Sequence, residues 1–153
     1  MPPDASSRTA SARVLQSRRF GPLEAPPDRL VHFPDGLLGF EEYTDYLLHA
    51  PEVLHPIRFL VACGDPELAF PVLPAALCTP DYVPLLPPEV WSLLGARAEE
   101  QLELLAVLTL DPETATLHAN LRGPVVINPA TRRGCQVVLH DSPYSLRYLL
   151  SVG

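Results

Sequence analysis

The sequence has no lysine, few charged residues and no long apolar run. Its positive charge comes entirely from arginine, and charged residues make up 19% of the chain. No apolar stretch approaches the roughly 20 residues that a membrane-spanning helix needs. The N-terminal stretch MPPDASSRTASARV also lacks the apolar segment of a secretory signal. These absences predict a protein without a membrane partner.

The motifs of common catalytic and metal sites are absent as well. The sequence holds no G-x-S-x-G, P-loop or G-x-G-x-x-G pattern, and its five histidines show neither H-x-x-x-H nor H-E-x-x-H spacing. Three cysteines without a C-x-x-C pair are typical of reduced thiols in a cytoplasmic protein; they are Cys63, Cys78 and Cys135. We therefore expect no cofactor, no metal and no enzymatic activity. A hydrolase using His140 or the surface carboxylates is the less favoured alternative.

Proline, in contrast, is abundant, with 19 residues in 153. Proline removes a backbone donor and blocks helix propagation, so this frequency argues against long helices. Short strand-like runs recur between turn signals such as Pro34-Asp35-Gly36, Asp65-Pro66 and Asp111-Pro112. Pro87-Pro88 opens the one clear helical pattern, with Val90, Leu93 and Leu94 as its apolar positions. The fold class predicted is all-β, a barrel or sandwich of short antiparallel strands with one or two short helices.

The composition changes near the start of the chain. We expect residues 1–17 to form a disordered tail and residues 18–153 to form a single domain. Within the domain, the segments 124–128 and 135–140 are the clearest strands near the C-terminus, and the loop PATRRG lies between them.

Charge is distributed in three blocks. Residues 1–29 carry a net charge of +2 (five arginines and three carboxylates), residues 30–121 carry −12 (two arginines and fourteen carboxylates), and residues 122–153 carry +3 (four arginines and one carboxylate). An acidic middle would repel a phosphate backbone, so we expect no direct nucleic-acid binding there. It would attract a basic protein surface and speed association with it.

Several acidic residues fall in the predicted turns, where a barrel would gather them at its rim. Apolar side chains among them could anchor a partner chain. The candidate partner-binding residues are Phe40, Glu41, Glu42, Asp65, Glu67, Asn120 and Asn128. For the two asparagines a structural role is the favoured interpretation, because an asparagine amide can satisfy backbone groups where a strand kinks or ends. Direct contact with a partner remains the alternative.

Four ordered motifs together resemble the FliW family of flagellar assembly factors. They are HFPDGLLGFEEYTDYLL, FLVACGDPELAFPVL, LTLDPETATLHANLRGPVVIN and GCQVVLHDSPYSLRYLL, and the resemblance as a whole covers about residues 18–150. The resemblance implies a small β-barrel regulator that binds two proteins. One is CsrA, an RNA-binding translational repressor, and its binding by the regulator relieves the repression of flagellin synthesis. The other is flagellin itself. The alternative from a different class is a nucleic-acid-binding barrel of the OB type, suggested by the basic N-terminal tail.

Overall fold

The structure is a computed structural model, and the description covers residues 13–97, 102–140 and 142–150. Within these ranges the chain is built mostly of strands. The strands are β1 (Arg13–Ser17), β2 (Gly21–Ala25), β3 (Leu30–His32), β4 (Asp45–His49), β5 (Arg58–Ala62), β6 (Ala69–Pro74), β7 (Glu103–Asp111), β8 (Thr116–Asn128), β9 (Arg133–Gln136) and β10 (Tyr148–Leu149). The helices are α2 (Ala75–Cys78) and α3 (Pro88–Leu94), with single 3₁₀ turns η1 (Pro27–Arg29) and η2 (Glu52–Leu54).

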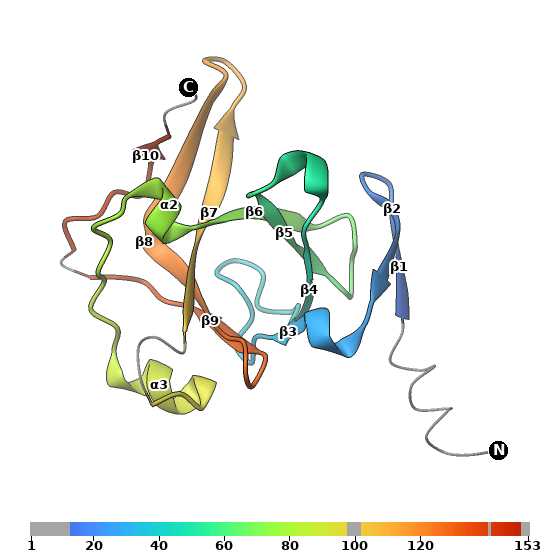
Figure 1. Ribbon diagram of the computed structural model, residues 1–153, viewed down its shortest axis with the longest axis horizontal. Helices are drawn as coiled ribbons and strands as arrows, with labels where there is room; N and C mark the ends of the chain where they lie inside the picture. Colours follow the sequence, from blue (N-terminus) through green and yellow to red (C-terminus); the bar gives the residue numbers. More distant parts are fainter. Residues whose placement is uncertain (1–12, 98–101, 141, 151–153) are drawn as a thin grey trace.

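The strands β3 to β9 close into a barrel (Figure 1). β8, β7, β6, β5, β4 and β3 are antiparallel neighbours in that order. β9 completes the ring, because it is antiparallel to β8 and also pairs with β3 through a parallel bridge between His32 and Arg133. Closure leaves few unpaired backbone groups at sheet edges. The all-β, barrel-like fold predicted from the sequence is confirmed.

Side chains alternate between the two faces of each strand, so apolar residues fill the inside of the barrel and also form clusters on its outside. The inner cluster contains one or two side chains from each of β3 to β8, among them the fully buried Tyr46, Leu60 and Val125. On the outer face, α3 packs against a separate cluster that includes Val126 and Cys135. Burying each of these large side chains contributes roughly 1.5–3 kcal/mol, so the two faces together hold the shell closed.

The N-terminal hairpin corrects the domain boundary expected from the sequence. Residues 13–17, which we had assigned to the tail, form β1 and pair with β2 around the turn that precedes Gly21. Leu15 and Leu23 are buried against the outer face of β4 and β5. Composition misled here, because polar and basic residues alternate with the few apolar ones that face the barrel. Residues 1–12 lie outside the described ranges.

The last barrel strands also differ in extent from the expectation. The strand expected at 124–128 is the end of the longer β8, which continues through Gly123 and Pro124. The strand expected at 135–140 is β9, which starts earlier, at Arg133, and ends at Gln136. Val137 and Leu139 still donate backbone hydrogen bonds, to Pro124 O and Arg122 O respectively.

The predicted helix is confirmed as α3. Pro88 is its first residue, where a missing N–H costs nothing, and Pro87 is the N-cap. Gly95 ends the helix in the left-handed region, with φ at 65°. The helix therefore begins and ends where local proline and glycine chemistry dictates.

Candidate functional site

Acidic residues gather at one end of the barrel, where two connections meet. The first connection, residues 33–44, joins β3 to β4, and the second, residues 63–68, joins β5 to β6. They are neighbours because Tyr46 pairs with Ala62 and because Cys63 N donates to Asp45 O at 2.9 Å. We define the acidic rim as five carboxylates on or next to these connections: Glu41, Glu42, Asp65 and Glu67, together with Asp45, the first residue of β4.

The first connection is tightly folded around two glycines. Gly36 has φ at +67°, and a Cβ there would lie 2.6 Å from Glu41 Cα, so only glycine fits. Gly39 also has a positive φ, and its N–H donates to Glu41 Oε2 at 2.9 Å. That hydrogen bond, with a smaller contribution from the Glu41 N–H, lowers the pKa of Glu41 below its ordinary value. The rim therefore carries Glu41 as a fixed carboxylate.

Two aromatic side chains pack the first connection against β6 and against the second connection. The Phe40 ring lies edge-on to Phe70, with centroids 5.0 Å apart. A Cβ added at Gly64 would lie 3.1 Å from the Tyr43 ring, so that ring rests directly on the second connection. Phe40 is half-buried, so it braces the rim and still presents part of its ring to solvent.

The second connection uses its carboxylates partly for structure. Asp65 Oδ1 accepts a hydrogen bond from Glu67 N at 3.2 Å, as expected of an aspartate that opens a turn. The Glu67 carboxylate accepts from Arg18 N at 3.1 and 3.2 Å, which ties the turn between β1 and β2 to the rim. Glu42, in contrast, is exposed and makes no hydrogen bond or ion pair within the described ranges.

Asn120 lies at an irregularity between β7 and β8. The register shifts from Leu105↔Val125 to Val107↔Asn120, so residues 121–124 of β8 face Ala106 alone. Asn120 Oδ1 accepts hydrogen bonds from Arg122 N at 3.0 Å and from Gly123 N at 2.9 Å. The asparagine thus satisfies two backbone groups that the ladder leaves unpaired, as its structural interpretation predicted.

Asn128 holds the far end of β8. Its side chain is 2% exposed, Nδ2 donates to Leu94 O at 2.7 Å, and Oδ1 accepts from Ala130 N at 3.0 Å. It therefore joins the C-terminus of α3 to the loop between β8 and β9. Because the side chain is buried, we leave Asn128 out of the partner-binding surface proposed below. Tyr82 is likewise buried and donates its hydroxyl to Leu121 O at 2.7 Å.

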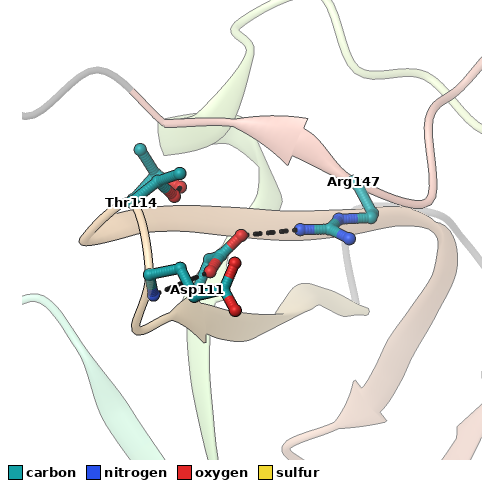
Figure 2. Close-up of polar contacts among 5 residues, drawn as sticks. Asp111, Thr114 and Arg147 are labelled. Carbon is teal, nitrogen blue, oxygen red and sulfur yellow. Dashed lines mark hydrogen bonds and ion pairs between the residues drawn. The ribbon is translucent and has the colours of Figure 1, made fainter.

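An apolar groove of about 750 Å³ lies on another face, beside the segment that precedes α3. Leu85 and Val83 stand exposed along it, and Tyr144 and Pro143 form part of its wall. Near this groove the C-terminal segment crosses β8, where Tyr148 pairs with Ala119. Figure 2 shows Arg147 of this segment reaching Asp111 at the end of β7, with Nη2 and Oδ2 3.6 Å apart.

The described residues also bear on the metal-binding, membrane and nucleic-acid alternatives. They contain no group of three or more His, Cys, Asp or Glu side chains placed to hold a metal ion. Across the same ranges, no helix is both long and apolar enough to pass through a membrane. Of the basic residues behind the nucleic-acid alternative, Arg13, Arg18 and Arg19 lie on or next to β1, and Arg8 lies outside the described ranges.

This barrel and these motifs have known counterparts. The sequence model described as "FliW protein" matches residues 14–150. The chain belongs to the FliW family. The flagellar assembly factor FliW of Thermotoga neapolitana is 36% identical over 141 residues, which cover 90% of this chain and 93% of the relative. That of Geotalea uraniireducens is 36% identical over 134 residues, covering 88% and 82%.

The fold agrees with that of a solved FliW. A crystal structure of the flagellar assembly factor FliW superposes with a TM-score of 0.84 at 26% identity, covering 92% of this chain and 99% of that one. These relatives are named as flagellar assembly factors.

The sequence did not identify Gln136, near the rim, as a site residue. Gln136 Oε1 accepts from Leu38 N at 3.0 Å, and its Nε2 donates to Gly123 O at 2.9 Å. Gln136 therefore links the segment between β3 and β4 to the irregular part of β8 that Asn120 holds. The signal was present, since Gln136 stands in the last of the four motifs, but an isolated glutamine suggests no particular contact.

Proposed function

We propose that this protein is a flagellar assembly factor that binds CsrA and flagellin in the cytoplasm and thereby relieves CsrA repression of flagellin translation. Membership of the FliW family supports the proposal most strongly. The acidic rim is the surface we assign to CsrA, because an RNA-binding protein carries basic side chains to neutralise phosphates. Five carboxylates on or next to two adjoining connections offer such a surface an opposite charge.

The acidic rim can both attract CsrA by charge before contact and hold it in the complex. Its carboxylates stand on a rigid support, since Gly36, Phe40 and Tyr43 fix the first connection against the barrel. Leu38, which is 52% exposed, lies on the same connection and offers an apolar anchor next to the charges. Exposed opposite charges mainly accelerate association, and buried apolar anchors slow dissociation.

Glu42 gives the cleanest test of this assignment. Glu41 and Glu67 hold backbone N–H groups, so reversing their charge would also disturb the fold. Glu42→Lys reverses one rim charge, as substitution of Glu41 or Glu67 would, but it removes no hydrogen bond or ion pair of the described residues. Glu52→Lys, on the exposed η2 turn at the far end of β4, is the matched control.

The measurement is the association and dissociation rate for purified CsrA and flagellin at two ionic strengths. We expect Glu42→Lys to slow CsrA association by roughly threefold to tenfold at low salt, with a smaller effect at high salt. Glu52→Lys should leave the rate nearly unchanged. If the wild type binds neither protein at micromolar concentration, the function proposed here is wrong. If both variants slow association equally, the rim is not the CsrA surface.

The same variants address flagellin. If Glu42→Lys weakens CsrA binding and spares flagellin binding, the two partners use different surfaces. If both are weakened, the surfaces overlap at the rim, which would make competition between the partners direct.

A further inference from the structure

A second charged site lies at the end of the barrel opposite the acidic rim. Here a pocket of about 270 Å³ opens where β3, β5 and β7 begin and where β4 and β8 end. Three arginines line it, Arg29, Arg58 and Arg132, although the protein as a whole carries a net charge of −7. We call it the arginine pocket.

Arg58 is positioned by an ion pair inside this pocket. Its Nη2 lies 3.0 Å from Glu103 Oε2, and the two side chains are 21% and 35% exposed. This is the one hydrogen bond of the Arg58 side chain within the described ranges, and a guanidinium has five N–H donors in a planar fork. Arg58 is therefore oriented by Glu103 and retains donors for a further acceptor.

Arg29 and Arg132 stand on fixed backbone. Arg29 N donates to Pro26 O at 2.9 Å. Arg132 has φ at 55°, its N donates to Asn128 O, and its O accepts from His32 N. Neither side chain has a hydrogen bond or ion pair within residues 13–97, 102–140 and 142–150, so both positive charges remain available.

The wall of the pocket beside the arginines is partly apolar. Val31 and Ile127, 5% and 3% exposed, and Leu48 form part of the pocket wall. Outside the pocket, burial first and the charge of Arg29 second lower the pKa of His49. Asp28 and Glu103 are the carboxylates at the pocket, and Glu103 is already paired with Arg58.

We propose that the arginine pocket binds a small organic oxyanion, a carboxylate or phosphate group carried on a short apolar body. The oxyanion would accept hydrogen bonds from Arg29 and Arg132, with Arg58 beside them, because guanidinium forks match these groups in geometry and charge. The apolar body would lie against Val31 and Ile127. The pocket has room for about nine water molecules, which suits a compact ligand rather than a nucleotide. This site is separate from the acidic rim, and its test does not depend on CsrA or flagellin.

The test is a titration of the full-length protein in low-salt chloride buffer. The probes are butyrate and butyl phosphate, compared with acetate and inorganic phosphate, which carry the same groups with little or no apolar body. Calorimetry gives the affinity, and NMR of the arginine side-chain N–H groups shows which arginines respond. The test variant is the double substitution Arg29→Gln and Arg132→Gln, which leaves the Arg58–Glu103 pair in place. The double substitution Arg19→Gln and Arg147→Gln removes the same charge elsewhere on the surface.

We expect butyrate or butyl phosphate to bind more tightly than the comparison ion with the same anionic group. Affinity should fall about tenfold or more in the test variant and less than about twofold in the control. The stronger of the two probes identifies the anionic group. No binding to the wild type, or an equal loss in both double variants, overturns the proposal. Binding of an acidic peptide alone, with none of the small anions, also overturns it.

Discussion

Replacement of Asn120 by alanine tests how the irregular part of β8 is held. Its Oδ1 is the acceptor for Arg122 N and Gly123 N, at 3.0 and 2.9 Å. The other backbone groups of this segment have partners of their own, such as Ser145 O for Leu121 N and Leu139 N for Arg122 O. Alanine would therefore leave two N–H groups without an acceptor while the rest of the segment stayed paired.

The magnitude follows from the burial of those two groups. Gly123 is buried, so its unpaired N–H costs about 1–3 kcal/mol, and the half-buried Arg122 N–H adds about 1 kcal/mol. The free energy of unfolding should fall by about 2–4 kcal/mol in total. For a chain of this length that corresponds to a drop of about 4–16 °C in the melting temperature.

Asn120→Asp is the matched control. A carboxylate keeps an oxygen at the position of Oδ1, and Asn120 Nδ2 donates no hydrogen bond within the described ranges. Thermal and urea unfolding of the three proteins should rank wild type and Asn120→Asp close together and Asn120→Ala well below. An alanine variant that melts within about 1 °C of wild type would refute the reasoning. If that variant also lost partner binding, Asn120 would belong to the contact surface.

Four further substitutions test the rim and the core. Gly36→Ala should destabilise the protein by about 3 kcal/mol and weaken CsrA binding, whereas Gly39→Ala, whose Cβ has open space, should cost only about 1 kcal/mol in unfolding experiments. The lowered pKa of Glu41 contributes stability that is present above its ordinary value of 4.5 and is lost as pH falls through the folded-state pKa, so the wild type should lose stability relative to Glu41→Gln on acid titration. The Tyr46 hydroxyl is buried without a partner in the described residues, so Tyr46→Phe should stabilise by about 1 kcal/mol. Burial raises the pKa of Tyr46 to about 12. As pH rises from 10 towards 12, the unfolded wild type therefore ionises this tyrosine before the folded protein does, and the wild type should lose folding stability relative to Tyr46→Phe.

Local chemistry made the turns and the helix predictable from the sequence. Gly36 requires a positive φ, Asp65 bonds the N–H two residues on, and Pro88 begins α3, each for a reason contained within a few residues. The acidic end of the barrel was predicted in the same way, since turns between short strands collect at the rim.

Contacts between distant segments were not predictable. Gly123 and Pro124 suggested the start of a strand, yet β8 runs through them, because Asn120, Gln136 and the C-terminal segment supply the hydrogen bonds that the ladder omits there. The anchoring of β1 depends likewise on Glu67, 49 residues away from Arg18. The role of Gln136 requires knowing that Leu38 lies beside it, which only the closed barrel brings about.

Barrel closure also explains how charged residues that are distant in the sequence come together at the two ends of the barrel. The two basic blocks lie at the two ends of the chain, and the ring closes by joining β3 to β9, so Arg29 and Arg132 meet next to the bridge between His32 and Arg133. The acidic rim lies at the other end of the same strands, on or next to the connections from β3 to β4 and from β5 to β6. An antiparallel ring separates these connections by the length of a strand, so the fold itself keeps the acidic rim and the arginine pocket apart. A basic partner and a small anion would then approach the protein from opposite directions, each attracted to one end and repelled by the other.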